Sequence, residues 1–157
     1  MSSAAVFDCM VFVQALANAN GPACACYEFV RCGRLILYVS PEIISEVGDV
    51  LSRPKVRRKL SALTDETAEA FLRDILGRAE TLSEVPATYR LERDPKDERY
   101  INLAIASGAS YLVTWDRDLL DLMNVEGFRR QFPHLIILEP PALLRLFPRD
   151  PEETAPE

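Results

Sequence analysis

The stretch RDPKDERYINLAIASGASYLVTWDRDLL, residues 93–120, contains a helical pattern, then a strand pattern, and then two acids. Its first half has apolar residues at helical spacing between Pro95, a common first-turn residue, and Gly108, a common stop residue. The run YLVT that follows is nearly continuously apolar, which is typical of a strand that is covered on both faces. The stretch therefore predicts one unit of an α/β fold, with Asp116 and Asp118 just beyond the end of its strand.

The same pattern recurs along the chain and predicts the fold class. Short apolar runs alternate with helical patterns, for which Ser40 and either Thr64 or Asp65 are predicted starts. This alternation favours a three-layer α/β/α sandwich around a central, mainly parallel sheet. The other predicted strands are AAVF (4–7), LILYV (35–39) and LIIL (135–138), with ETLSEV (80–85) as a weaker fifth.

Length and composition favour one compact domain. The 157 residues suit a single core, predicted over residues 1–147, and PRDPEETAPE, residues 148–157, is expected to be a disordered, acidic, proline-rich tail. No apolar run reaches the roughly 18 residues of a membrane span, and the chain does not start with a secretory signal pattern, so we expect a cytoplasmic protein. The net charge of -6 disfavours binding of nucleic acid by bulk positive charge.

Two acids follow separate predicted strands. Asp8 comes directly after the first apolar run, and Asp116 lies just beyond the YLVT run. Because the carboxyl ends of parallel strands form the edge at which α/β proteins build their sites, both carboxylates are expected there. Asp116 fits either a helix cap or a metal site, whereas Asp118 is predicted to be the N-cap of a helix over LLDLM.

Two further acids lie on the inward side of predicted helices. Glu46 falls at the flank of an apolar stripe that includes Ile43 and Val47, so it is either part of a site or a boundary glutamate with a solvated head. Asp97 follows Asp94 by three residues and fits a capping box in a first helical turn, but it also begins the inward stripe. A first-turn acid on that face can bind a cation as well as cap the helix.

These predictions bring four carboxylates together: Asp8, Glu46, Asp97 and Asp116. Like charges at close range demand either protonation or a cation. The set has oxygen ligands only, since His134 is distant and the cysteines lack a zinc spacing, which favours Mg²⁺ or Mn²⁺ over zinc. A pair of such ions roughly 3.5–4 Å apart activates water and stabilises the leaving oxygen in phosphodiester cleavage.

The chain resembles the PIN-domain family, the metal-dependent ribonuclease fold of many toxin–antitoxin toxins. VFDCMVFVQAL resembles its opening strand and aspartate, VSPEIISEVGDVLSRPKV its glutamate helix, and RDPKDERYINLAIASGASYLVTWDRDLL a characteristic stretch of its toxin-component branch. The resemblance runs from about Val6 to about Phe147. It implies the sheet order 3-2-1-4-5, with Asp8 and Asp116 on either side of the point where the strand order reverses.

The resemblance further implies an endoribonuclease that uses Mg²⁺ or Mn²⁺ to hydrolyse RNA phosphodiester bonds, as the toxin of a toxin–antitoxin pair. It makes the four acids the catalytic and metal-binding site, with Asp118 as an auxiliary acid near the metal and Thr114 as a support of the cleft. Its implied products carry a 5′-phosphate and a 3′-hydroxyl. The implied partners are RNA, a cognate antitoxin protein and a second copy in a homodimer, with no membrane.

Basic and aromatic residues close to these motifs are candidates for RNA contacts. A basic patch, RPKVRRK, offers four side chains to the RNA backbone: Arg53, Lys55, Arg57 and Arg58. A solvated basic helix face fits the same pattern. Trp115 offers a ring for stacking on a base, which contributes about 1–3 kcal/mol in single-strand binding.

Two departures from the family pattern keep other functions open. Met10 stands where the family commonly has Asn or Ser, and Trp115 stands where a small residue is common; a thioether donates no hydrogen bond. The alternative is a catalytically weak or inactive PIN-fold module that binds RNA or regulates. Phosphatases of the haloacid-dehalogenase type and response-regulator receivers also begin with a strand and an aspartate, but the former have a second acid two residues on and the latter have paired acids near the N-terminus.

Overall fold

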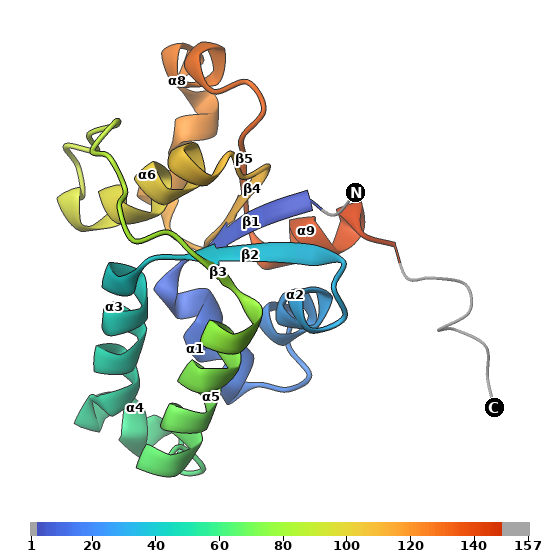
Figure 1. Cartoon of the computed structure of the whole chain (residues 1–157), viewed down its shortest axis with the longest axis vertical. Helices are drawn as coiled ribbons and strands as arrows, with labels where there is room; N and C mark the ends of the chain where they lie inside the picture. The colour runs from blue at the N-terminus through green and yellow to red at the C-terminus, as the bar shows by residue number, and fades with distance from the viewer. Residues whose placement is uncertain (1–2, 149–157) are drawn as a thin grey trace.

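The computed structural model describes residues 3–148, which form one five-stranded sheet with helices around it (Figure 1). The strands pair in parallel in the order β3-β2-β1-β4-β5, which confirms the predicted fold class and strand order. They are β1 Ser3–Phe7, β2 Leu35–Val39, β3 Glu80–Thr81, β4 Tyr111–Val113 and β5 Ile136–Leu138. The weaker strand predicted over 80–85 is therefore a short edge strand. Apart from Pro148, the tail predicted over 148–157 lies outside the described residues.

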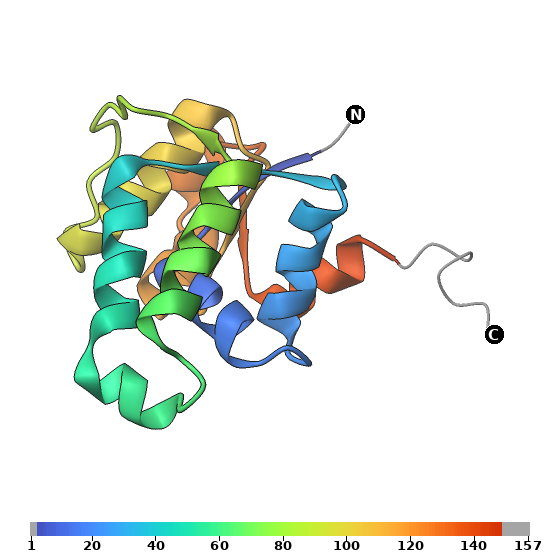
Figure 2. The same ribbon diagram turned by 60° about the horizontal axis from the view of Figure 1, so that its bottom comes forward.

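Helices cover both faces of the sheet and complete the predicted sandwich (Figure 2). On one face, α2 packs against α1 and α9, and α3 packs against α1 and α5. On the other face, α6 packs against β1, β2 and β4. The longer helices are α1 Cys9–Ala17, α2 Pro22–Arg31, α3 Pro41–Ser52, α5 Asp65–Arg78, α6 Glu98–Ser107 and α9 Pro140–Leu146. Shorter elements are α4 Pro54–Lys59, η1 Pro95–Asp97, α7 Arg117–Leu120, η2 Asp121–Asn124 and α8 Glu126–Gln131.

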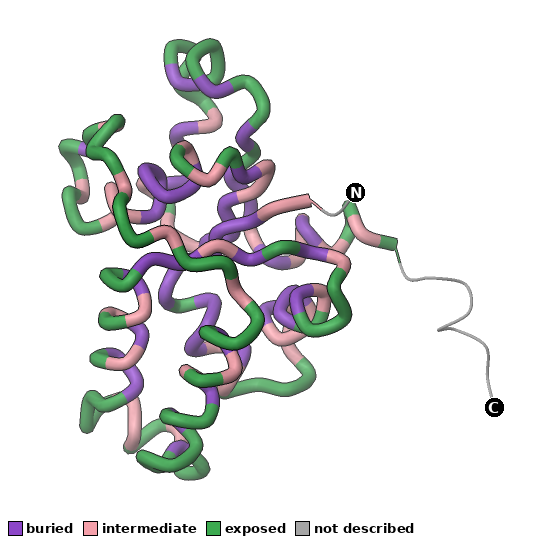
Figure 3. The backbone as a smooth tube through the Cα atoms, viewed as in Figure 1, coloured by how far each residue is buried: buried purple, intermediate pink, exposed green. Residues whose placement is uncertain are grey.

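The second half of the central strand β1, from Ala5 to Phe7, is buried in the core (Figure 3). Ala5 aligns with Leu37 of β2 on one side and with Tyr111 of β4 on the other. Val6 is fully buried, because helices cover both faces of the sheet. The continuous apolar run of β1 therefore follows from its position between two layers of helices. Among residues 3–148, no helix is long and apolar enough to cross a membrane.

The order of the strands creates a crevice at the carboxyl end of β1. The chain passes from β1 through α1 and α2 to β2, which lies on one side of β1, whereas β4 lies on the other side. Connections that leave neighbouring strands in opposite directions cannot close over the space between them, so ligand sites of open α/β sheets form there. Asp8 and Asp116 follow the two strands that border this point.

Ser40 caps α3 as predicted, and Gly108 ends α6 in the left-handed conformation with φ 67°. The Ser40 Oγ accepts a hydrogen bond from the backbone N–H of Ile43 at 3.2 Å. We expect Ser40→Ala to lower the free energy of unfolding by about 1 kcal/mol, measured by urea denaturation. Ser40→Thr keeps an acceptor oxygen and is expected to stay close to wild type; equal losses in both variants would contradict a capping role.

Candidate functional site

Asp8 lies at the carboxyl end of β1 and is held from β4. Its backbone N–H donates to Val113 O at 3.0 Å, and its Oδ2 accepts a hydrogen bond from Thr114 Oγ1 at 2.7 Å. Asp8 is 8% exposed, and this burial raises the pKa of its carboxyl group. Hydrogen bonds from Thr114 and from the backbone of Met10 oppose the rise in pKa, whereas the negative charges of Asp116 and Glu46 add to it.

Thr114 joins the two aspartates that follow β1 and β4. It is fully buried, and its own N–H donates to Leu138 O of β5 at 3.0 Å. While its hydroxyl donates to Asp8, the same Oγ1 accepts from the backbone N–H of Asp116 at 2.9 Å. One hydroxyl therefore fixes the side chain of one aspartate and the backbone of the other, which orients both toward the crevice edge.

Asp116, and not Asp118, is the N-cap of the following helix, so the prediction for Asp118 was wrong. Asp116 Oδ1 accepts from the backbone N–H of Asp118 at 2.8 Å, at the start of α7. The chain turns into the helix directly after the strand, which leaves Asp118 inside the first turn. There Asp118 pairs with Arg93 at 3.0 Å instead. The cap employs Oδ1 of Asp116 and leaves its second oxygen for another partner.

Asp94, Asp97 and Asp116 form a compact acidic cluster. One carboxylate oxygen from each lies within 4.8 Å of the others, and all three residues are partly exposed. Burial, followed by the charges of Asp116 and Asp8, raises the pKa of Asp97 to about 8. Among the described residues, Asp97 Oδ2 is the buried side-chain oxygen that has no hydrogen-bond partner.

The chemistry of this cluster fits a hard divalent cation. An unpaired buried carboxylate oxygen beside two other carboxylates is costly for a metal-free protein, because the charges repel and one oxygen lacks the hydrogen bonds of water. A cation would remove both costs. Oxygen ligands without histidine or thiolate are the donor set of Mg²⁺ or Mn²⁺ rather than of zinc.

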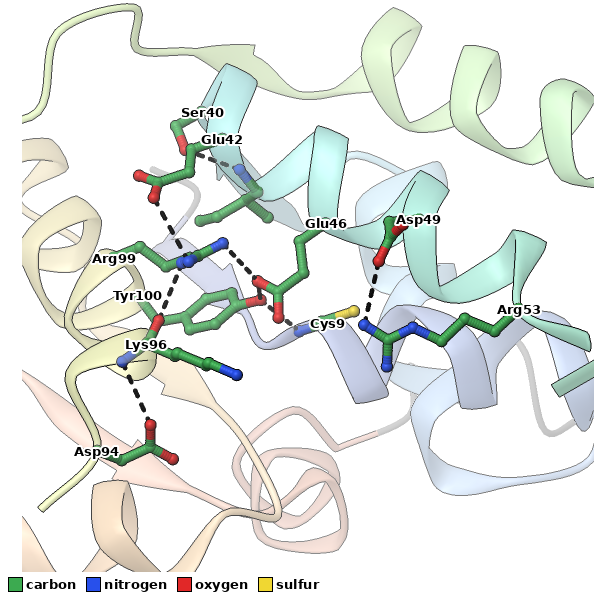
Figure 4. A network of polar contacts seen from close by, with 11 residues as sticks. Cys9, Ser40, Glu42, Glu46, Asp49, Arg53, Asp94, Lys96, Arg99 and Tyr100 are labelled. Carbon is green, nitrogen blue, oxygen red and sulfur yellow. Dashed lines mark hydrogen bonds and ion pairs between the residues drawn. The ribbon is translucent and has the colours of Figure 1, made fainter. Parts of the chain in front are cut away.

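Glu46 lies at the same edge but is bound to partners from α6 (Figure 4). Its Oε2 accepts from Tyr100 Oη at 2.5 Å and from Arg99 Nη1 at 3.1 Å. Tyr100 Oη in turn accepts from the backbone N–H of Cys9 at 3.3 Å. Burial, followed by the hydrogen bond to Glu46, raises the pKa of Tyr100 and keeps it a donor. Glu46 thus adds negative charge beside Asp8, while Arg99 partly neutralises it.

Comparison with known proteins identifies the chain. A sequence model described as the PIN domain matches residues 4–118. The chain belongs to the PIN-domain family. An uncharacterized protein of Methanocaldococcus jannaschii is 28% identical over 119 residues, which are 76% of this chain and 74% of that protein. A crystal structure of VapBC2 from Rickettsia felis, bound to a DNA fragment from their promoter, matches with a TM-score of 0.55 and 16% identity, over 87% of this chain and 98% of that one. That structural likeness shows the shared fold.

In this PIN domain the basic patch predicted to contact RNA lies apart from the acidic cluster. α4 lies at the end of α3 that is far from the sheet (Figure 1). Arg57 is used within the fold, since it donates to Leu51 O at 2.8 Å and pairs with Asp65 at 2.7 Å. Lys55 and Arg58 are exposed on α4. Arg53 pairs with Asp49 at 3.1 Å and lies beside Cys9 in Figure 4.

Trp115 is partly buried and is bound to α1. Its indole Nε1 donates to Gln14 Oε1 of α1 at 2.6 Å, and its ring packs against the core. Met10 is 45% exposed, two residues after Asp8. The two positions that depart from the family pattern therefore differ, since one side chain is tied to α1 and the other faces solvent beside the site.

Three residues of this site were missed as site residues in the sequence: Asp94, Arg99 and Tyr100. Asp94 was interpreted as a helix cap, and it does accept from the N–H of Lys96 at 3.2 Å, but it also joins the cluster. Arg99 and Tyr100 gave no signal, because their roles depend on how α6 lies against α3. Asp97 is the N-cap of α6, and Arg99 and Tyr100 lie in the first turn that follows it.

Proposed function

We propose that this PIN domain is a Mg²⁺- or Mn²⁺-dependent endoribonuclease. The observation that carries the proposal is the acidic cluster at the crevice, in which the buried Asp97 Oδ2 lacks a partner. Members of the family are generally nucleases, which agrees with an acidic site at this edge. An ion of this class, when bound, supplies a water of lowered pKa and a positive charge for the phosphate.

The role of each acid in this site follows from its position. Asp97, Asp116 and Asp94 would hold the ion, because their oxygens already converge. Asp8, oriented by Thr114, adds negative charge at the end of β1 and is the next candidate ligand. Tyr100 keeps Glu46 in place. Glu46 would bind the ion through a water molecule or contact the substrate. The N-cap bond of Asp116 fixes one of its oxygens and so orients the other.

A toxin–antitoxin role is part of this proposal. The likeness to VapBC2, a complex in that crystal structure, supports a protein partner, and an acidic crevice suits a partner that inserts a basic side chain. Homodimer formation and the cytoplasmic location stay predictions, as do RNA contacts through Arg53, Lys55, Arg57, Arg58 and Trp115. The second candidate is an inactive RNA-binding module, which is favoured by the exposed thioether of Met10 beside Asp8.

Cleavage of labelled single-stranded RNA by the purified protein tests the function. We expect fragments with 5′-phosphates in Mn²⁺ or Mg²⁺, no cleavage in EDTA, and recovery when Mn²⁺ is added back. Asp8→Asn, purified in parallel, is expected to abolish cleavage, and Glu69→Gln on the exposed side of α5 is a matched control that keeps wild-type cleavage. Cleavage that persists in Asp8→Asn would contradict the site. RNA binding without cleavage in every metal would favour the second candidate.

A further inference from the structure

The acids of the crevice differ in how their negative charges are balanced. Asp94, Asp97 and Asp116 bring their oxygens within 4.8 Å of one another, and Asp97 Oδ2 has no hydrogen-bond partner. In the described part of the chain, none of these three acids forms an ion pair. Glu46, in contrast, is paired with Arg99 of α6 (Figure 4). The chain therefore supplies a positive charge for Glu46 and leaves the acidic cluster without one.

The pair between Arg99 and Glu46 is supported by further bonds on each partner. Arg99 Nη1 donates to Glu46 Oε2 at 3.1 Å, and Arg99 Nε donates to Lys96 O at 2.9 Å. Tyr100 Oη donates to the same Glu46 oxygen at 2.5 Å. The side chains of Arg99 and Glu46 are only 24% and 28% exposed, so solvent screens this pair less than a surface pair. The contact of Arg99 with the exposed Glu42 is longer, at 3.5 Å, which makes Glu46 its main partner.

Asp8 and Glu46 are the two predicted metal ligands that lie outside the acidic cluster. They are close enough that the negative charge of Glu46 contributes to the raised pKa of Asp8. Tyr100 connects them, because its hydroxyl donates to Glu46 and accepts from the backbone N–H of Cys9, the residue after Asp8. A second ion beside the acidic cluster would need carboxylates of its own, and these two acids are the available pair.

The charge of Arg99 opposes a second cation at this place. An ion bound to Glu46 would lie next to a guanidinium, which stays protonated in proteins, and the two positive charges would repel each other. The ion would also have to compete with two hydrogen-bond donors for Glu46 Oε2. At the acidic cluster a cation relieves repulsion between acids instead. The first ion is therefore expected there, and a second ion beside Glu46 is disfavoured.

We propose that Arg99 is a positioning residue that keeps Glu46 out of direct metal coordination and limits the RNA-free protein to one bound divalent ion. That ion binds at the acidic cluster, and the guanidinium of Arg99 takes the place of a second ion beside Glu46 and Asp8. The inference rests on the proposed metal-dependent function and deepens it, because it assigns the number of ions and the residue that sets this number.

Equilibrium dialysis against Mn²⁺ counts the ions bound per chain and requires no RNA cleavage. We expect one ion per chain in the wild type and two in Arg99→Gln, because the released Glu46 then shares an ion with Asp8. Arg99→Lys keeps the positive charge and is expected to bind one ion. The double variant Arg99→Gln/Glu46→Gln loses the acid together with the arginine, so its count is expected to return to one.

Arg93→Gln is the matched control for the loss of one positive charge. Arg93 directly precedes Asp94 and pairs with Asp118 at 3.0 Å, but it has no bond to Glu46. We expect Arg93→Gln and Arg99→Gln to raise the affinity for the first ion to a similar extent, by about fivefold or less, as for one solvent-screened charge. Only Arg99→Gln is expected to bind a second ion. A second ion in Arg93→Gln as well would show a general effect of charge and would overturn the role of Arg99.

Thermal melting shows whether the variants fold and gives a second measure of the pair. In EDTA, Arg99→Gln is expected to melt about 2–4 °C below the wild type, because Glu46 then lies near Asp8 without a compensating charge. Mn²⁺ is expected to raise its melting temperature more than that of the wild type. Two ions in the wild type, or one ion in both the wild type and a folded Arg99→Gln, would overturn the inference and leave the proposed ribonuclease intact. Failure of both proteins to bind Mn²⁺ would overturn the metal-dependent function and this inference with it.

Discussion

Replacing Asp97 by asparagine is expected to stabilise the metal-free protein at pH 8 and to abolish RNA cleavage. The pKa of this carboxyl group rises to about 8 in the fold from its usual value of 3.8. Between these pH values the folded state binds more protons than the unfolded state, so stability falls as pH rises. Asparagine carries no charge, and its amide can donate to the neighbouring carboxylates.

The expected gain is modest because Asp97 is partly exposed and solvent screens the repulsion. We expect on the order of 1 kcal/mol, or about 2–4 °C in melting temperature for a domain of this size. The difference between variant and wild type should shrink as the pH is lowered toward 4. Cleavage should fall at least about 100-fold, as for the loss of a group that stabilises charge in a transition state.

Thermal melting of both proteins from pH 4 to pH 8 in EDTA, and again with Mn²⁺, measures this effect. Mn²⁺ should stabilise the wild type, by about 2.7 kcal/mol at 100 times the dissociation constant, and the asparagine variant much less. Glu69→Gln controls for the removal of an unrelated carboxylate. A variant that melts below the wild type at every pH would show that Asp97 is not under repulsion.

Replacing Thr114 by valine is expected to cause the largest loss of stability among the changes considered for this site. Valine nearly preserves the shape of the side chain but removes the donor to Asp8 Oδ2 and the acceptor for Asp116 N. Each buried polar group left without a partner costs about 1–3 kcal/mol, so we expect a loss of about 2–4 kcal/mol. Mn²⁺ binding should weaken as well, because both aspartates lose their orientation.

Thr114→Ser is the matched control for this prediction. Serine keeps the hydroxyl and both hydrogen bonds and loses one methyl group, so it should retain Mn²⁺ affinity and cost about 1 kcal/mol. Urea denaturation at constant m-value, with Mn²⁺ titration by calorimetry, measures both properties. Equal Mn²⁺ affinities of the valine variant and the wild type would show that Thr114 does not position the acids.

The strands could be predicted from the sequence because buried strands consist of recognisable runs of apolar residues. AAVF is continuously apolar since helices cover both faces of β1, and such a run can be recognised without knowledge of the fold. LILYV gives the same signal, although Ile36 of β2 is exposed. The strand order came from the family resemblance, because no local pattern records which strand lies beside which. β3 is short and exposed, so its signal was weak for a physical reason.

The site was predictable only in part, because contacts between distant residues leave no local pattern in the sequence. Asp8 and Asp116 follow strands, and the rule that sites form at strand ends placed both correctly at one edge. The cap was assigned to Asp118 because the sequence does not show where a turn begins. The bonds of Glu46 to Arg99 and Tyr100 join residues 53 and 54 positions apart, and such contacts depend on the packing of α3 against α6.

The bond between Thr114 and Asp8 spans 106 positions in the chain, and this separation bears on how the protein is made. Contacts between distant positions form late, since the loop between them must close first. On the ribosome, β1 has no partner from β4 until the residues that separate the two strands have been synthesised. A nascent chain therefore lacks its acidic site until these residues have been made, and the domain can fold around that site only afterwards.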